Sequence, residues 1–517
     1  AFWGIIFIAD GLAIFLAAIA AVIGSLAVIF SIDYMHGANQ LGRYYALVLF
    51  FIGAMCGLVL SGSLLLIFFF WEITAFCSYA LISFHNDDVK AVRGGMKALI
   101  ITQVGGIGLL MGALFIYSYT GSFDIQTFLA NSARLPTGAL AVIAFGFLFA
   151  AAAKSAQFPF QTWLPDAMEA PSPVSALIHA ATMVNAGVYL LARFYPAFST
   201  VPGWSSAVIL TGALSGLLAA LMALTASDLK RALAYSTVSQ LGYMVYAIGA
   251  GSVLAAQFHL FSHAIFKALL FLAAGAVIHS LATRDMHRMG GFARQMPRVF
   301  AVFIIGALAL AGLPFLNGFW SKELVLEAGM TDGPAWAFIV MLLTTGVTAM
   351  YSLRMVWLVF FDAPRSPVHG HDAAPAMQIS LFVLAGGTLL SWLLVGPFSQ
   401  LLEATLPFHE MRSERTFVFL TEVLTARSTA LAMTVTFLGL AAWWWREQWA
   451  GLTGRLNEIS RLTANSFGFE AINAAVVKAT QASAEGLRSA HTGLINWNVL
   501  AIIAALVMIM AILALGA

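Results

Sequence analysis

Residues 257–272, QFHLFSHAIFKALLFL, place three protonatable side chains inside an otherwise apolar run. His259, His263 and Lys267 stand at intervals of four residues, so on a helix they stack along one face. Together they cover two helical turns, roughly 12 Å of rise. Histidine exchanges protons near neutral pH because its unperturbed pKa is about 6.5. The segment therefore predicts a helix that carries a row of proton-exchanging sites through nonpolar surroundings.

The composition indicates that nearly the whole chain is as apolar as this segment. Of its 517 residues 61% are hydrophobic and only 9% are charged, whereas soluble domains have about 25% charged residues. Apolar runs long enough to span a bilayer recur, and only helices satisfy the backbone within one such segment. We expect an all-α polytopic membrane protein with fourteen transmembrane helices, near 4–32, 43–62, 63–84, 94–119, 138–163, 172–195, 205–226, 231–250, 254–281, 298–325, 334–360, 377–402, 428–446 and 495–516.

The link from 447 to 494 differs, because charged residues alternate with Ala, Leu and Val. Its later part, 466–492, is typical of an amphipathic helix that lies along a surface. Loop charges indicate the orientation: the loops 85–93 and 283–297 should face the cytoplasm. The basic residues that support this assignment are Arg43, Lys90, Arg93, Lys230, Arg231, Arg284, Arg288, Arg294 and Arg365.

Further ionisable residues interrupt the apolar runs. A charge at the bilayer centre costs about 2.5–3.5 kcal/mol on insertion scales, so such residues are functional candidates. They are Glu72 in 67–83, Lys154 in 145–160, His179 in 174–189, and Lys322 with Glu323 in 312–326.

Other interpretations apply to single members of this set. One histidine could be a hydrogen-bonded packing residue, and Glu72 with Lys154 could be a structural ion pair. His259 and His263 could bind zinc or a haem, but zinc would require further ligands that the segment does not offer. Cys56 and Cys77 are too few for an iron–sulfur cluster. Because six or more such groups recur across five spans, we favour a proton path and expect no metal and no cofactor.

Two prolines interrupt predicted spans near buried lysines. Pro159 follows Lys154 by five residues, and Pro314 precedes Lys322 by eight. Proline removes a backbone donor and breaks a helix, and transporters place paired broken helices at their ion sites. The breaks lie five spans apart, which fits two inverted five-helix repeats.

Several segments resemble the antiporter-like subunits of respiratory complex I, above all subunit L, together with the large subunits of Mrp-type Na⁺/H⁺ antiporters and membrane-bound hydrogenases. The similarity covers nearly the whole chain. It rests on WEITAFCSYALISF (71–84), KSAQFPFQTWLPDAMEAPSPVSALIHAATMVNAGVYLLAR (154–193), DLKRALAYSTVSQLGYM (228–244), FHLFSHAIFKALLFLAAGAVIH (258–279) and GFWSKE (318–323).

This resemblance implies a role for each candidate. Glu72 resembles the glutamate that pairs with the pumping lysine, Lys154 resembles that lysine, and His179 resembles the bridging histidine. His259, His263 and Lys267 resemble the central hydrophilic axis, Lys322 resembles the terminal lysine beside Glu323, and Asp228 with Lys230 resembles a further charged pair.

The resemblance also implies a division of the chain and a missing N-terminal segment, since subunit L carries two further helices there. The expected parts are N-terminal flanking helices (1–62), a first antiporter-like half (63–195), a second half (205–360), C-terminal flanking helices (377–446), a lateral amphipathic helix (447–494) and a final anchor (495–517).

Some positions differ from subunit L. The segment 101–110, ITQVGGIGLL, lacks the acidic residue expected there, and its Gly105–Gly106 pair is more similar to Mrp or hydrogenase subunits. Phe158 and residues 192–198 share that tendency, whereas QTWLPDAM (161–168) and Asn185 are closer to subunit L.

We therefore expect a proton-translocating subunit of a complex I-like, redox-driven pump without a redox centre of its own. The alternatives are a subunit of an Mrp-type Na⁺/H⁺ antiporter or of a membrane-bound hydrogenase; a solute transporter or a self-contained enzyme is less consistent with the dispersed polar groups. The expected partners are other membrane subunits, including further antiporter-like ones, the lipid bilayer and H⁺ or Na⁺, but not nucleic acid. The expected location is a bacterial or archaeal inner membrane.

Overall fold

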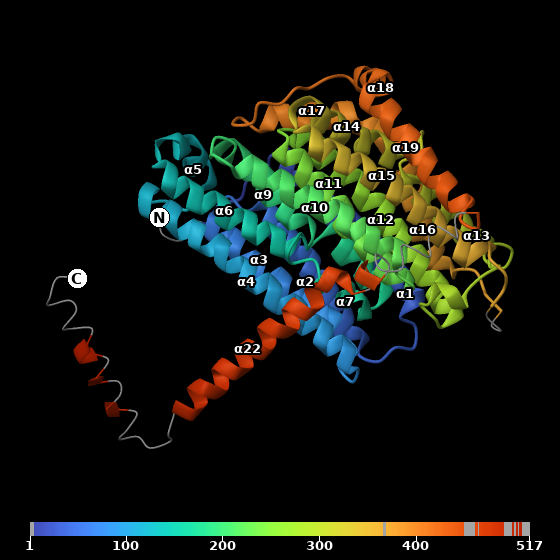
Figure 1. Cartoon of the computed structure of the whole chain (residues 1–517), viewed down its shortest axis with the longest axis horizontal. Helices are drawn as coiled ribbons and strands as arrows, with labels where there is room; N and C mark the ends of the chain where they lie inside the picture. The colour runs from blue at the N-terminus through green and yellow to red at the C-terminus, as the bar shows by residue number, and fades with distance from the viewer. Residues whose placement is uncertain are drawn as a thin grey trace. The chain divides into compact units, whose positions relative to one another are not determined.

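The computed structural model describes residues 5–365, 369–448, 461–463, 465–490, 499–500, 503–504 and 506–508. Within these ranges the chain is helical apart from loops and isolated β-bridges. Contacts divide it into two units, Ala1–Thr463 and Ala464–Ala517. The first unit is a helix bundle that contains every candidate residue (Figure 1).

The first unit begins with α1 (Gly11–Tyr34), α2 (Leu41–Leu60), α3 (Leu64–Ile82), α4 (Val89–Thr120), α5 (Ile125–Asn131), α6 (Thr137–Lys154), α7 (Trp163–Asp166), α8 (Ser172–Ala176), η3 (Leu177–Ala181) and α9 (Asn185–Phe198). It continues with α10 (Trp204–Thr225), α11 (Leu229–Gly249), α12 (Val253–Leu281), α13 (Pro297–Ala311), α14 (Asn317–Asp332), α15 (Ala335–Val356), α16 (Pro375–Leu390), α17 (Val395–Thr405), α18 (Thr416–Thr425) and α19 (Arg427–Trp444).

The predicted all-helical membrane fold is confirmed, but the number of spans is not. Length and hydropathy identify ten membrane-spanning helices in the described residues, or eleven if the bent pair α18–α19 forms one span. The difference arises because α13 is short, α11 is rich in polar residues, and most of 495–516 lies outside the described residues. Fourteen spans therefore stay a prediction.

Helices α11 and α12 form the centre of the bundle and pack against each other (Figure 1). Every residue of α11 except Arg231 is buried, although the helix contains Ser236, Thr237, Ser239 and Gln240. Polar side chains at this depth are tolerated when they face protein instead of lipid. The centre of this bundle consequently contains polar side chains as well as apolar ones.

Both predicted helix breaks are confirmed. Helix α6 ends at Lys154, and the chain resumes helical structure only at Trp163; Ala156 in the gap has a φ of 50°. Helix α13 ends at Ala311, and α14 begins at Asn317. Gly312 and Phe315 have φ values of 82° and 69°, a region that stops helix propagation. The inverted relation between the two repeats stays a prediction.

A third break, which the sequence pattern did not indicate, lies at His179. The span predicted at 172–195 consists of α8, one π-helical turn (η3) and α9. Thr182 donates to the carbonyl of Leu177 at 2.8 Å, and Asn185 donates to that of Ala180 at 2.8 Å. These side chains replace backbone donors that the interrupted helix loses, so the break needs no proline.

The second unit contains α22 (Phe469–Ala490), which corresponds to the amphipathic helix predicted at 466–492. Its course along a surface stays a prediction, as does the division of the chain into antiporter-like halves. The stretch 449–460 and most of the final anchor lie outside the described residues.

Close packing of α10 on α11 gives the first testable prediction. A Cβ on Gly242 would lie 2.7 Å from the carbonyl oxygen of Gly212, where only backbone could yield. Gly242→Ala should therefore lower stability by about 1–3 kcal/mol, the usual range for overpacking. Gly53→Ala is the matched control, because a Cβ there meets nothing within 4 Å. Thermal unfolding in detergent measures both, and equal midpoints for the two variants would contradict the packing.

Candidate functional site

Lys154 is the last residue of α6 and is fully buried. Its ammonium donates to the carbonyl of Trp71 at 2.7 Å and lies 4.9 Å from the centre of that indole ring. Glu72, the next residue on α3, interacts with Lys154 electrostatically, but the two form no ion pair within 4.0 Å. The two residues of the predicted pair are therefore neighbours in the structure, but their charged groups are not in direct contact in this conformation.

The Gly105–Gly106 pair of α4 provides the space for this arrangement. A Cβ on Gly106 would lie 2.4 Å from Oε1 of Glu72, and one on Gly105 would lie 2.4 Å from Cβ of Ala153. Gly106 thus leaves room for the carboxylate of Glu72, and Gly105 lets α4 approach α6 beside Lys154. These two glycines therefore shape the surroundings of the Glu–Lys pair.

The predicted histidine ladder on α12 is present and fully buried. His259 bonds Ser321 through Nδ1 at 3.0 Å and Gln240 through Nε2 at 3.2 Å. The ring of His263 lies 6.4 Å from that of His259 and has no hydrogen-bond partner. Lys267 donates to Ser236 and, at 3.1 Å, to the carbonyl of Leu233. The ladder thus connects α12 with both α11 and α14.

His179 joins this ladder from the third helix break. Its ring stacks on Phe271, with 5.1 Å between the centroids, and it interacts electrostatically with Lys230 and Lys267. Neither ring nitrogen has a protein partner. Buried polar atoms of this kind are commonly satisfied by water. The structure brings His179 to Lys267, but no direct contact joins it to Lys154.

Lys322 is held at the end of another helix. Its ammonium donates to the carbonyl of Leu310 at 2.8 Å, in the last turn of α13, and lies 5.7 Å from the ring centre of Tyr243. A helix C-terminus carries partial negative charge, which stabilises a cation. Glu323 follows it and is also buried. Both predicted lysines therefore donate to backbone carbonyls, and that of Lys322 belongs to the C-terminal end of a half-helix.

The loops with basic residues meet at one face of the bundle. The predicted pair Asp228–Lys230 is not an ion pair there, because Asp228 bonds Arg284 at 3.2 Å and Lys230 donates to the carbonyl of Ala170 at 2.5 Å. Although burial lowers the pKa of Arg284, its bond to Glu169 and the charge of Asp228 raise that pKa above its usual value.

Asp166, which follows the first break, is fastened to the same face. Its carboxylate bonds Lys97 at 2.8 Å and Arg231 at 2.6 Å. One oxygen anchors the segment to α4 and the other anchors it to α11. Sequence reasoning missed this role of Asp166, although its carboxylate stands alone among apolar residues in a short helix.

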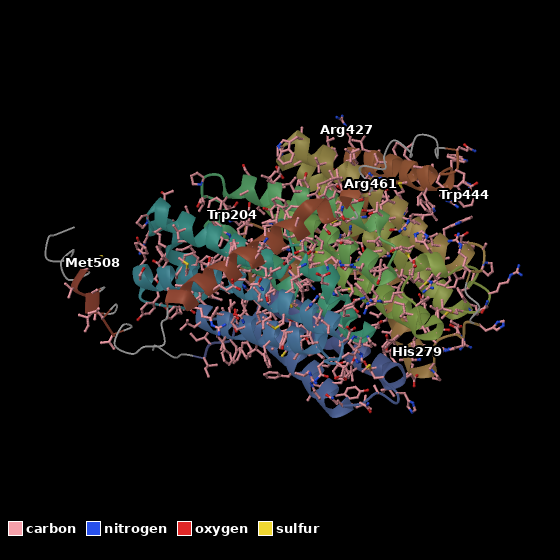
Figure 2. The ribbon with its side chains drawn as sticks, turned by 60° about the horizontal axis from the view of Figure 1, so that its bottom comes forward. Trp204, His279, Arg427, Trp444, Arg461 and Met508 are labelled. Atoms are coloured by element: carbon pink, nitrogen blue, oxygen red, sulfur yellow. The ribbon has the colours of Figure 1, made fainter. Side chains whose placement is uncertain are left out.

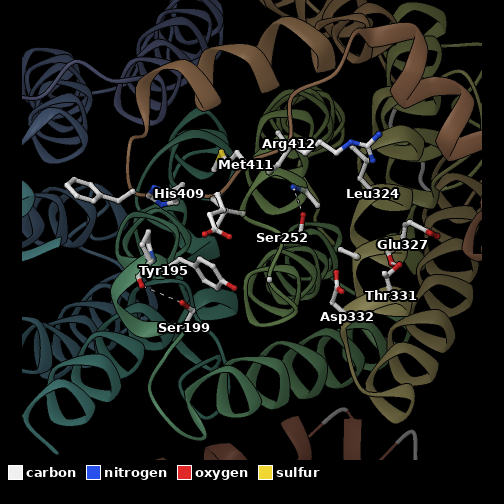
Figure 3. Close-up of a pocket in the computed structure, with 18 of the residues that line it drawn as sticks. Tyr195, Ser199, Ser252, Leu324, Glu327, Thr331, Asp332, His409, Met411 and Arg412 are labelled. Atoms are coloured by element: carbon white, nitrogen blue, oxygen red, sulfur yellow. Dashed lines mark hydrogen bonds between the residues drawn. The ribbon is translucent and has the colours of Figure 1, made fainter. Parts of the chain in front are cut away.

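A cavity of about 670 Å³ lies at the other end of α12 (Figure 3). Since α12 has 29 residues, roughly 40 Å separate the two ends; Trp204 and His279, far apart in Figure 2, mark these two regions. Among its lining residues are Tyr195, Glu327, Thr331, Asp332, His409 and Arg412.

The cavity reaches the helix that carries Lys322. Glu327 lines it and stands four residues after the buried Glu323, on the same face of α14. His409, in the connection before α18, donates from Nε2 to the carbonyl of Ala192 at 2.8 Å. Burial lowers the pKa of His409, and the positive charge of Arg193 contributes. The neutral imidazole therefore donates to that carbonyl at neutral pH.

Buried amides near the breaks and the ladder were not among the predicted site residues. Gln157, Gln161, Gln240, Gln257 and Asn317 each retain a buried amide atom without a protein partner. Such atoms suit ordered water. A signal existed for Gln257 and Asn317, since each interrupts an apolar run. Within the described residues, no group of three His, Cys, Asp or Glu side chains could hold a metal ion.

Comparison with known proteins agrees with this architecture. A family model described as "NADH:quinone oxidoreductase/Mrp antiporter, TM" matches residues 61–348. A second model, "NADH-Ubiquinone oxidoreductase (complex I), chain 5 N-terminus", matches residues 4–45. The two matches include every predicted site residue.

Relatives of two kinds match similarly well. The chain is 42% identical over 369 residues to NAD(P)H-quinone oxidoreductase chain 5 of Synechocystis sp., covering 68% of this chain and 54% of the relative. It is 39% identical over 406 residues to Na⁺/H⁺ antiporter subunit A1 of Staphylococcus aureus, covering 73% and 51%. The chain thus matches about half the length of these relatives.

Two solved assemblies share the fold. The Mrp complex from Dietzia sp. superposes with a TM-score of 0.84 at 31% identity, covering 98% of this chain and 56% of the other. An archaeal membrane-bound sulfane sulfur reductase superposes with a TM-score of 0.69 at 26% identity, covering 80% and 84%. On these matches, the chain belongs to the family of antiporter-like membrane subunits shared by NADH:quinone oxidoreductase and Mrp antiporters.

Proposed function

We propose that this chain translocates protons as an antiporter-like subunit of a redox-driven, complex I-like pump. The observation that carries this proposal is the continuous series of buried ionisable groups from His179 through Lys267, His263 and His259 to Lys322. In this proposal Lys154 and Glu72, beside the first helix break, supply the proton that enters this series.

An Mrp-type antiporter subunit is the second candidate. The extent of the match to the Mrp complex favours it, and so does the space that Gly106 leaves for Glu72. The same path would then use an existing ion gradient and exchange H⁺ for Na⁺. Redox subunits that co-purify would support the pump, whereas their absence from an active complex would support the antiporter.

In the proposed mechanism, a neighbouring subunit changes the separation between Glu72 and Lys154. A carboxylate within about 4–6 Å stabilises an ammonium, so its withdrawal favours release of the proton. The absence of an ion pair within 4.0 Å supports a pair that opens and closes. Water beside the unpartnered atoms of His179 would carry the proton onward to Lys267.

The second half of the path leads to the cavity. His259 lies between His263 and Lys322, and Glu323 is followed by Glu327 at the cavity wall. A proton that reaches Lys322 would leave through these carboxylates. We further propose that the chain assembles with other membrane subunits in an inner membrane and that its own residues hold no redox cofactor.

The first test of this function is Lys154→Ala in the assembled complex. The variant should abolish proton translocation because it removes the buried ammonium at the end of α6, beside the first break. Lys90→Ala, which removes an exposed ammonium in the first turn of α4, is the matched control and should behave as wild type. Acidification of reconstituted vesicles measures both variants, with subunit content checked in parallel. Normal acidification by assembled Lys154→Ala would refute the proposal.

The second test addresses the exit. Glu327→Gln should slow translocation while leaving assembly intact, since an amide cannot take up and release the proton that passes Glu323. Glu410→Gln is the control, because Glu410 lines the same cavity but is exposed and lies outside α14. Equal rates for the two variants would exclude Glu327 from the path.

The third test concerns orientation. After replacement of Cys56 and Cys77, Arg288→Cys should react with a membrane-impermeant thiol reagent from the cytoplasmic side. Thr331→Cys, in the cavity, should react from the opposite side; both positions are exposed. Labelling of both cysteines from one side would contradict the inferred topology.

A further inference from the structure

Ser321 occupies a position between the histidine ladder and the second helix break. It is fully buried in the first turns of α14, directly before Lys322. Its Oγ lies 3.0 Å from Nδ1 of His259 and 2.9 Å from the carbonyl oxygen of Asn317. One hydroxyl thus lies within hydrogen-bonding distance of a titratable ring and of the residue with which α14 begins.

The other nitrogen of His259 determines what this hydroxyl can do. Nε2 lies 3.2 Å from Oε1 of Gln240, which can only accept a hydrogen bond. Nε2 therefore carries a hydrogen in both the neutral and the protonated ring. Gain or loss of a proton by His259 consequently occurs at Nδ1, the atom that faces Ser321.

The two protonation states require opposite orientations of the Ser321 hydroxyl. When His259 is neutral, Nδ1 is an acceptor, and the hydroxyl donates to it. When His259 is protonated, Nδ1–H donates to Oγ, so the hydroxyl hydrogen must turn away. The carbonyl of Asn317, at 2.9 Å, is the nearer acceptor, and that of Gly318 lies at 3.5 Å. A side chain that bonds the carbonyl four residues earlier tends to bend its helix.

We propose that Ser321 is a positioning residue whose hydroxyl turns with the protonation of His259 and thereby couples the ladder to the start of the helix that carries Lys322. The inference rests on the proposed proton-translocating function. Asn317 would transmit this change to neighbouring elements, because its side-chain amide donates to the carbonyl of Ser262 at 3.2 Å and to the hydroxyl of Ser391 at 3.0 Å. A change at its carbonyl is thus resisted by α12 and by the turn after α16.

The surroundings of His259 explain why such a coupling matters. Lys322 interacts with it electrostatically, His263 lies one turn away, and the ring of Tyr243 lies 6.2 Å from it. Protons on His259 and Lys322 together would repel each other in a medium of low dielectric. A shift of the first turn of α14 when His259 is charged would change the contact between Lys322 and Leu310.

The experiment compares Ser321→Ala, Ser321→Thr and Ser239→Ala in the reconstituted complex. Ser321→Ala should slow translocation by about tenfold, which one hydrogen bond to a charged group can contribute, and should shift the pH profile of the rate. Ser321→Thr keeps the hydroxyl and should restore both. Ser239→Ala, which removes a buried hydroxyl on α11 that bonds Gly216, should change neither.

A double variant separates coupling from packing. In a His259→Gln background, Ser321→Ala should have no further effect, because the hydroxyl then has no titrating partner. Additive losses, or an unchanged pH profile in Ser321→Ala, would overturn the inference. If Ser321→Ala does not assemble, Ser321→Cys replaces it, since a thiol is a weak donor of similar size.

The outcome for Lys154→Ala keeps the two proposals apart. If the Lys154→Ala variant still translocates protons, the proposed function itself is refuted. If Lys154→Ala is inactive and Ser321→Ala behaves as wild type, only the proposed role of Ser321 is refuted.

Discussion

Two buried lysine ammoniums beside the helix breaks are held by backbone carbonyls and not by tight ion pairs, and much of the architecture follows from this. Lys154, the last residue of α6, donates to the carbonyl of Trp71 within α3, and Lys322 donates to the carbonyl of Leu310 at the C-terminal end of α13. The partial negative charge of a helix end offsets a cation without a full counter-charge. A tight ion pair would trap the proton, whereas carbonyl ligands let each lysine be occupied or empty at modest cost. The breaks at 155–162 and 312–316 are therefore as much a part of the site as the lysines themselves.

The sequence predicted those parts of the molecule that carry an unusual signal against an apolar background. Three features could be predicted: the ladder of His259, His263 and Lys267, the two proline-associated breaks and the other buried ionisable residues. Each places polar groups in an apolar run, where they are costly and therefore conspicuous. The break at His179 could not, since Thr182 and Asn185 compensate for it with side chains that are ordinary in membrane helices. The number of spans stays a prediction, in part because α11 is buried so completely by protein that it needs little hydrophobicity.

The Gly105–Gly106 pair shows how an apparent departure from a family pattern acquires a physical meaning. In the sequence it stands where an acidic residue was expected. In the structure, each glycine makes room for one side of the Glu72–Lys154 pair, and any side chain at 106 would collide with the carboxylate. The glycines thus let α4 pack closely against α3 and α6 where an acidic side chain would otherwise stand. Glu72 is then the acidic group with which Lys154 interacts.

The spacing of the ladder limits how many protons it can hold at once. Two like charges at the 6.4 Å separation of the His259 and His263 rings repel by about 3 kcal/mol at an effective dielectric constant of about 20. Double occupancy of neighbours is therefore disfavoured by roughly two orders of magnitude, and a proton entering at one end displaces one further along. Such a path has no direction of its own, because each step is reversible. Direction must come from a change in the Glu72–Lys154 separation that is imposed from outside the chain, which is why the proposed function is that of a subunit.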